Sequence, residues 1–296
     1  MKVYDCFTYF DEDLILEIRL NILNEYVDYF VIVESTFNHN GEKRKLRFDI
    51  NKYGKFKNKI KYIVWDVSPK DIEKISDDDT EKLKEDKFII NAIKRENGQR
   101  NYIMKGIEDA SDEDLILLSD LDEIPSLSNL DLSNIKEKII IFEQIMCYYK
   151  FNLAVPNYKW FGTRACLKKN LKNPQWLRNI KARKYPLFRI DILFNDKKYN
   201  DIKLINEGGW HFTNIKHPEE IHLKYKSYLH HREYELSGMN VDKIKEIIKN
   251  RHTLYDLKID QRKNKIGKGM KLTNLHKNKL PEYVLSKRKE FATWFD

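Results

Sequence analysis

Hydrophobic and polar positions alternate in blocks along the first part of the chain. Residues 2–10 are aromatic and β-rich, and apolar positions at helical spacing follow in residues 14–23. Residues 29–33 form a continuous apolar run of strand length, which is typical of a parallel strand buried on both faces. A strand, a helix and a second strand in this order predict a βαβ unit and an α/β fold.

The same patterns predict further elements down the chain. Residues 59–67 indicate another strand, residues 68–84 a charged and solvated loop, and residues 86–110 a helix. Later elements are a strand at 138–142 and helices at 218–236 and 240–255. We expect the helix at 86–110 to bury an apolar stripe formed by Phe88, Ile89, Ala92, Ile93, Ile103 and Ile107. The predicted organisation is a catalytic domain over 1–236 and a helical, Lys-rich extension over 237–296.

The stretch 114–125 places a group of acids at the end of a buried strand. The apolar run 115–118 is followed by Asp120, Asp122 and Glu123, and Pro125 then turns the chain. Buried carboxylates that repel one another are unfavourable unless a cation offsets them, and a divalent metal is a common solution. The Asp-x-Asp spacing therefore indicates a metal site. The alternative is a solvated turn in which the acids cap the next element, because a bare Asp-x-Asp is common.

Other polar positions are predicted to meet at the same edge of the sheet. In open α/β sheets, ligands bind beyond the carboxyl ends of the strands. This rule places Thr8 and Phe10, at the end of the first strand, and Glu34, at the end of the second, beside a potential nucleotide site.

The helix that precedes the Asp-x-Asp strand carries a second set of candidates. Arg95 and Gln99 are four residues apart and share one helix face, and Arg100 follows directly. A helix leading into this strand is well placed to aim an arginine at the same pocket. The alternative is a surface helix with ordinary salt bridges.

Two later segments combine aromatic residues with turns. Trp160 lies in the segment YKWFGTR, where an exposed ring could stack on a sugar, although a core position is equally consistent with the pattern. Gly208 and Gly209 directly precede Trp210 and His211, which indicates a tight turn or a close approach of the backbone to a ligand.

Bulk composition excludes several classes of protein. Hydrophobic residues make up 41% of the 296 positions, enough for a sizeable core, and the net charge of +9 is spread along the chain. We find no nucleic-acid motif, so the basic surface is interpreted as solvated and no nucleic-acid partner is expected. Three cysteines without a CxxC pair argue against a disulfide framework. No apolar run is long enough for an integral membrane segment.

Several stretches together resemble glycosyltransferase family 17, the family of the β-1,4-mannosyl-glycoprotein β-1,4-N-acetylglucosaminyltransferase. They are YDCFTYFDEDLILEIRLNILNEYVDYFVIVES, RENGQRNYI, SDLDEIP and GGWHF, in this order, and they cover roughly the first 230 residues. The resemblance implies a GT-A-type, Rossmann-like, mostly parallel sheet flanked by helices. It also implies an inverting transfer from a UDP-sugar, most simply UDP-N-acetylglucosamine, to a glycan, glycoprotein or glycolipid acceptor.

The resemblance also implies roles for individual residues. Mn²⁺ or Mg²⁺ is expected as the cofactor, with Asp120, Asp122 and His211 as candidate metal ligands. An inverting transfer needs a general base, for which Glu207 and Glu143 are the candidates. The remaining expected contacts with the donor, nucleotide or sugar are Thr8, Phe10, Glu34, Arg95, Gln99, Arg100, Asp120, Trp160 and Trp210.

Departures from the animal members of the family shape the rest of the prediction. The chain begins without a long apolar segment, and it is rich in Lys, Ile and Asn. We therefore expect a cytoplasmic enzyme of microbial or viral origin, either free or peripheral at a membrane. Two other hypotheses are a non-catalytic carbohydrate-binding protein and a phosphotransferase that uses the Asp-x-Asp as its metal site.

Overall fold

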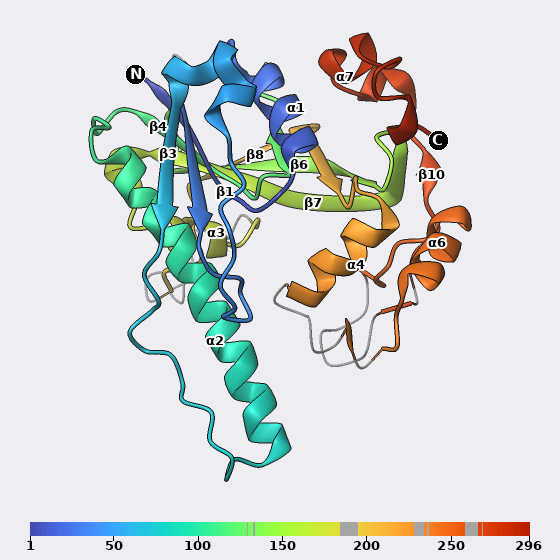
Figure 1. Ribbon diagram of the computed structural model, residues 1–296. Helices are drawn as coiled ribbons and strands as arrows, with labels where there is room; N and C mark the ends of the chain where they lie inside the picture. The colour runs from blue at the N-terminus through green and yellow to red at the C-terminus, as the bar shows by residue number, and fades with distance from the viewer. Residues whose placement is uncertain are drawn as a thin grey trace.

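The computed structural model shows a mixed α/β protein built on one curled central sheet (Figure 1). It describes residues 1–128, 130–132, 134–183, 195–227, 234–235, 237–257, 266–267 and 269–296. The main strands run in the order β3-β2-β1-β4-β7-β6-β9-β5, with β8 paired to β6 and β10 paired to β7.

The first half of the sheet is parallel. Strand β1 pairs with β2 and β4, and β2 pairs with β3, all in parallel register. The carboxyl ends of these four strands therefore lie at one edge, and the Asp-x-Asp follows β4 at that edge. The bounds are β1 Val3–Tyr9, β2 Tyr29–Ser35, β3 Ile60–Trp65 and β4 Leu115–Leu118, which confirms the strands predicted in this region.

The second half mixes parallel and antiparallel pairs. Strand β7 is antiparallel to both β4 and β6, whereas β8 and β9 are parallel to β6. Strand β5 is antiparallel to β9, which sets Glu123 opposite His211. The bounds are β5 Glu123–Pro125, β6 Ile139–Tyr148, β7 Leu153–Leu167, β8 Ile202–Ile205, β9 Gly209–Thr213 and β10 Thr273–Asn274.

Hydrophobic cores cover both faces of the sheet, because successive side chains of a strand point to opposite faces. On β4, Leu115 and Leu117 pack in the core that includes α1, whereas Ile116 and Leu118 pack in the core that includes α3. The helix bounds are α1 Asp13–Leu23, α2 Glu81–Asn101, α3 Pro174–Asn179, α4 Pro218–Ser227, α6 Val241–Lys249 and α7 Glu282–Ser286. Short 3-10 helices are η1 Ile50–Lys59, η2 Tyr102–Ile107, η3 Lys168–Asn170, η5 Lys277–Lys279 and η6 Ala292–Trp294.

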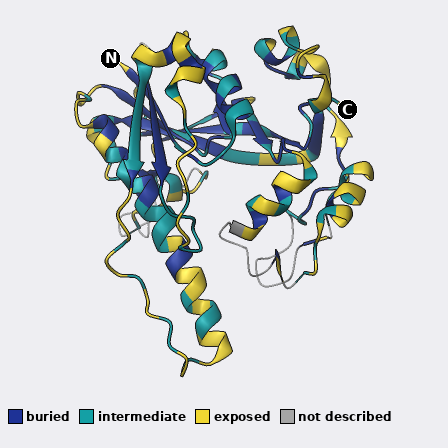
Figure 2. Ribbon diagram, viewed as in Figure 1, coloured by how far each residue is buried: buried dark blue, intermediate teal, exposed yellow. Residues whose placement is uncertain are grey.

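The prediction for the stripe of the 86–110 helix is wrong in its first half. Ala92, Ile103 and Ile107 are buried as expected, but Phe88, Ile89 and Ile93 are 42%, 43% and 39% exposed. The reason is that the N-terminal half of α2 projects beyond the sheet, so it has no core to cover (Figures 1 and 2). The helix also begins at residue 81, within the segment predicted to be a loop.

A buried ion pair holds the Asp-x-Asp loop to α1. Arg19 and Asp5 are fully buried, and the guanidinium donates to both carboxylate oxygens at 2.7 and 2.6 Å. Its Nη1 also donates to the backbone carbonyl oxygens of Asp120, Leu121 and Glu123, at 3.2, 3.1 and 2.8 Å. One arginine thus bonds three carbonyls of this loop, which helps to fix the direction in which the acids point.

The C-terminal region packs against the sheet. Val284 and Phe291 are buried in the same core as α1, and the backbone N–H of Phe151 donates to the carbonyl oxygen of Trp294 at 2.8 Å. Helices α4 and α6 form a third core at the ends of β6 and β7, which includes Ile221 and Ile244. Among the described residues, none of the helices has the length and hydropathy needed to cross a membrane.

Candidate active site

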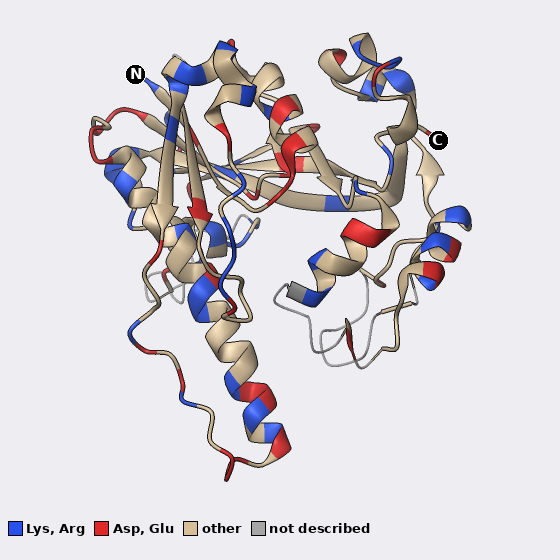
Figure 3. Ribbon diagram, in the orientation of Figure 1, with Lys and Arg blue, Asp and Glu red and all other residues tan. Residues whose placement is uncertain are grey.

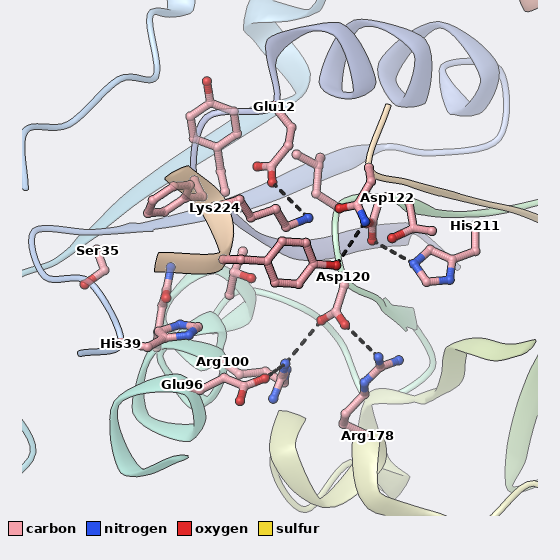
Figure 4. Close-up of a pocket in the computed structure, with 18 of the residues that line it drawn as sticks. Glu12, Ser35, His39, Glu96, Arg100, Asp120, Asp122, Arg178, His211 and Lys224 are labelled. Atoms are coloured by element: carbon pink, nitrogen blue, oxygen red, sulfur yellow. Dashed lines mark hydrogen bonds and ion pairs between the residues drawn. The ribbon is translucent and has the colours of Figure 1, made fainter. Parts of the chain in front are cut away.

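A cavity of about 660 Å³ lies beyond the carboxyl ends of β1, β2 and β4. Its walls come from the loops after these strands, from α2, α3 and α4, and from the ends of β6 and β9. This is the position where open α/β sheets bind ligands, and the volume is in the range of pockets for small molecules and cofactors. Figure 4 shows that charged side chains line its floor.

Asp120 faces two arginines. Its Oδ2 lies 2.6 Å from Nη2 of Arg178 on α3, and its Oδ1 lies 3.2 Å from Nη2 of Arg100 on α2 (Figure 4). Burial would raise the pKa of Asp120, but the two guanidinium groups outweigh it and hold the pKa below its usual value. Both carboxylate oxygens are therefore already paired with cations.

Asp122 faces His211 instead. The Oδ1 of Asp122 lies 3.4 Å from Nε2 of His211, which is 7% exposed (Figure 4). Burial would raise the pKa of Asp122 and lower that of His211, yet their mutual attraction outweighs it, so the pKa of Asp122 is lowered and that of His211 is raised. The other ring nitrogen of His211, Nδ1, is buried and has no hydrogen-bond partner.

This donor set fits a metal ion held by two protein ligands. Within the described ranges, no three His, Cys, Asp or Glu side chains are grouped so that they could hold a metal ion. The carboxylate of Asp122 and the imidazole of His211 are nevertheless adjacent, and no arginine of the described residues is paired with either. Sites of this kind bind Mg²⁺ or Mn²⁺ through one or two side chains and take further oxygens from substrate phosphates and water.

Glu123 organises the wall beside these acids. It is fully buried and accepts hydrogen bonds from Arg178, at 2.8 Å to each oxygen, and from Nε1 of Trp160 at 2.7 Å. Gly162 makes this close packing possible, since a Cβ at that position would lie 2.0 Å from Oε1 of Gln144. Trp160 in turn lies against His211, with ring centroids 4.8 Å apart.

A fourth carboxylate, Glu12, lines the opposite side. It lies at the start of α1, and its Oε1 is 3.8 Å from Nζ of Lys224 on α4 (Figure 4). Burial would lower the pKa of Lys224, but the carboxylates of Asp122 and Glu12 outweigh it and raise that pKa. The ammonium group of Lys224 thus lies near the Asp122–His211 pair and is favoured in its charged form.

Eight of the residues predicted from the sequence line this one cavity. They come from five separate segments of the chain and converge as the rule for strand ends requires. They are Thr8, Phe10, Gln99, Arg100, Asp120, Asp122, Trp160 and His211.

The structure places the other five outside the lining. The carboxylate of Glu34 is buried and accepts from the hydroxyl of Tyr62 and from the backbone of the loop that folds over it. Arg95 donates to the carbonyl oxygen of His39, 3.1 Å away. The Nε1 of Trp210 donates to the carbonyl oxygen of Lys279 at 2.6 Å.

The two predicted bases, Glu207 and Glu143, are also elsewhere. The side chain of Glu207 is 70% exposed and pairs with Lys279, and Glu143 lies 2.8 Å from Lys159. Each of these carboxylates therefore faces a lysine at the surface and not the acids of the cavity.

Arg178, Lys224 and Glu12 are among the cavity residues that had no predicted role. Arg178 lies 58 residues after Asp120 in the chain, so no local spacing connects them. A weak signal existed for Glu12, because it follows the end of the first strand and so belongs to the same edge as Thr8 and Phe10.

The sequence matches one known family. The family model of glycosyltransferase family 17 matches residues 1–294, whereas the resemblance noted from motifs covered only the first 230 or so. The match thus includes the C-terminal region in which no motif was found. No match was found among curated proteins.

Proposed function

The chain belongs to glycosyltransferase family 17, and on this premise we propose that it transfers a sugar from a UDP-sugar to a hydroxyl group of an acceptor. We propose UDP-N-acetylglucosamine as the donor and a GT-A-type, inverting reaction. The acceptor is a glycan, a glycoprotein or a glycolipid.

One observation supports this proposal above all others. A single wall of the cavity carries an Asp–His pair suited to a metal ion and, beside it, two arginines held by Asp120. A nucleotide diphosphate needs both kinds of contact, because its charge must be neutralised and its two phosphates must be oriented. An uncharged carbohydrate alone would not require this arrangement.

We assign the donor contacts as follows. Asp122 and His211 would hold Mn²⁺ or Mg²⁺, which would supply Lewis-acid stabilisation of the departing diphosphate. Asp120 acts through Arg178 and Arg100, whose guanidinium groups it directs toward the phosphates. Trp160, fixed by its hydrogen bond to Glu123, presents an aromatic ring for the donor sugar.

The general base must come within hydrogen-bond reach of the acceptor hydroxyl. Of the carboxylates that line the cavity, Glu96 and Asp120 are bound by arginine and Asp122 pairs with His211. The Oε2 of Glu12 accepts from the backbone N–H of Asp11 at 3.1 Å, and its Oε1 forms only a long ion pair with Lys224, 3.8 Å away, so Oε1 can still face an acceptor hydroxyl. We therefore propose Glu12 as the base in preference to Glu207 and Glu143.

The test is a screen for UDP release with UDP-N-acetylglucosamine, UDP-glucose, UDP-galactose and GDP-sugars, each with Mn²⁺ and with a chelator. We expect release from a UDP-sugar only with the metal, and none after Asp122→Ala. Full activity with the chelator would sink the metal assignment. Comparing Glu12→Gln with Glu207→Gln identifies the base, because only loss of the true base abolishes transfer while UDP still binds.

A further inference from the structure

The outer face of α2 is the largest concentration of exposed aliphatic side chains in the described part of the chain. Among the described residues, nine large hydrophobic side chains are exposed, and five of these nine lie on α2. Leu83, Ile89, Ile90 and Ile93 share one face by their helical spacing, each about two-fifths exposed. An exposed apolar patch that the fold does not cover marks an interaction site.

The protein holds this projecting helix in place. The buried side chain of Asn91 accepts from the backbone N–H of Glu73 at 2.7 Å and donates to its carbonyl oxygen at 2.9 Å. Lys87 binds Asp79 at 2.6 Å. These contacts secure segment 73–79 against one side of α2, whereas Ile89, Ile90 and Ile93 remain exposed. The apolar face therefore belongs to a helix that tertiary contacts hold in place, and not to a frayed helix end.

The apolar face leads directly into the cavity. Ile93 belongs to both, since it lines the cavity and is 39% exposed. From Ile93 to Leu83 the helix rises about 15 Å, at 1.5 Å per residue. Residues 88–93 in the middle of α2 are uncharged, and Figure 3 shows charged residues on the helix before and after this stretch.

We propose that this face binds the apolar chain of an amphiphilic acceptor, so that the acceptor is a lipid-linked sugar whose head group enters the cavity. The inference rests on the proposed function and names the acceptor class. Leu83, Ile89, Ile90 and Ile93 are purely aliphatic, which suits an alkyl or isoprenoid chain, whereas sugars are bound by aromatic rings. The alkyl or isoprenoid chain of the acceptor would lie along this apolar face and extend outward from the cavity.

A second copy of this chain fits the face less well. Four side chains that are each two-fifths exposed fall far short of the roughly 800 Å² per partner of a stable dimer. A symmetric pair of α2 helices would also bury Ile93 and cover the cavity. A bilayer surface with anionic lipids is disfavoured, because segment 71–86 contains Asp71, Glu73, Asp77, Asp78, Asp79, Glu81, Glu85 and Asp86 against only three lysines.

The test uses octyl, decyl and dodecyl maltosides below their micelle concentrations as probes, with binding measured by calorimetry. We expect the dissociation constant to fall about twofold per added methylene. Moving one methylene group completely out of water would lower the dissociation constant about fourfold. An alkyl chain that lies on one helix face buries only about half of its surface, so about half of that free energy is expected. In the double variant Ile89→Ser, Ile90→Ser this dependence on chain length should disappear.

Phe88→Ser is the matched control, since Phe88 is equally exposed on the same helix but points to another side. It should leave the dependence on chain length intact. An affinity that does not depend on alkyl chain length would overturn the proposal. So would an equal loss of this dependence in Phe88→Ser and in the double variant. A dimer that forms with rising protein concentration and is broken by the double variant would also overturn it. UDP release without acceptor, measured on the same samples, tests the proposed function separately, because the varied residues lie outside the donor contacts.

Discussion

Replacing Arg19 by methionine should destabilise the protein by about 3–5 kcal/mol. The substitution keeps an apolar stem of similar length but leaves the carboxylate of Asp5 buried and without its cation, which is the costly way to break a buried pair. It also removes a donor to the carbonyl oxygens of Asp120, Leu121 and Glu123, of which the first and the last keep another hydrogen bond. Buried groups left unsatisfied cost about 1–3 kcal/mol each, although such costs do not add fully.

The assay is urea unfolding followed by circular dichroism. Arg47→Met is the matched control, because Arg47 is 56% exposed and lies 3.7 Å from Asp11, so it should change stability by no more than about 0.5 kcal/mol. The double variant Arg19→Met, Asp5→Leu should lose about 2 kcal/mol less unfolding free energy than the two single variants lose in sum, since it removes the orphaned charge. Additivity within about 0.5 kcal/mol would refute the reasoning.

Three other consequences can be measured. Arg178→Lys should weaken UDP binding about tenfold or more, because a lysine cannot bridge two carboxylates and still face the phosphates; an unchanged affinity by calorimetry would contradict this. Burial lowers the pKa of His39, so acidification below its ordinary pKa, near 6.5, should favour the unfolded chain. The wild type should therefore lose more thermal stability than His39→Gln between pH 8 and pH 5, and parallel losses would refute it. Burial also raises the pKa of Cys6, Cys147 and Cys166, the last to about 12, so a thiol reagent at pH 8 should label them only after unfolding; labelling of the native protein would contradict their burial.

The elements around the cavity were predictable because their signals are local. The alternation of apolar runs and amphipathic segments in residues 2–35 identified β1, α1 and β2, and the apolar run before Asp120 identified β4. The rule that ligands bind beyond strand ends then grouped Thr8, Phe10 and the acids correctly.

What could not be predicted depends on contacts far apart in the sequence. The side chain of Glu34 was placed at the right edge, but the loop that returns over it takes both carboxylate oxygens. Asp120 pairs with Arg178 from a distant helix, a contact that no local spacing indicates, and its role as a metal ligand stays a prediction. Periodicity correctly assigned residues 88–93 to a helix, but it could not show that this part of α2 extends past the sheet.

Thermal protection by UDP tests the central claim most directly, namely that Asp122 and His211 bind a diphosphate through a metal ion. We predict that UDP raises the melting temperature of the wild type with Mn²⁺ present and not with a chelator, and that Asp122→Asn abolishes the effect. Asn is close to Asp in size, so the variant should fold. Equal protection by UDP in the chelator, or full protection of Asp122→Asn, would contradict the account.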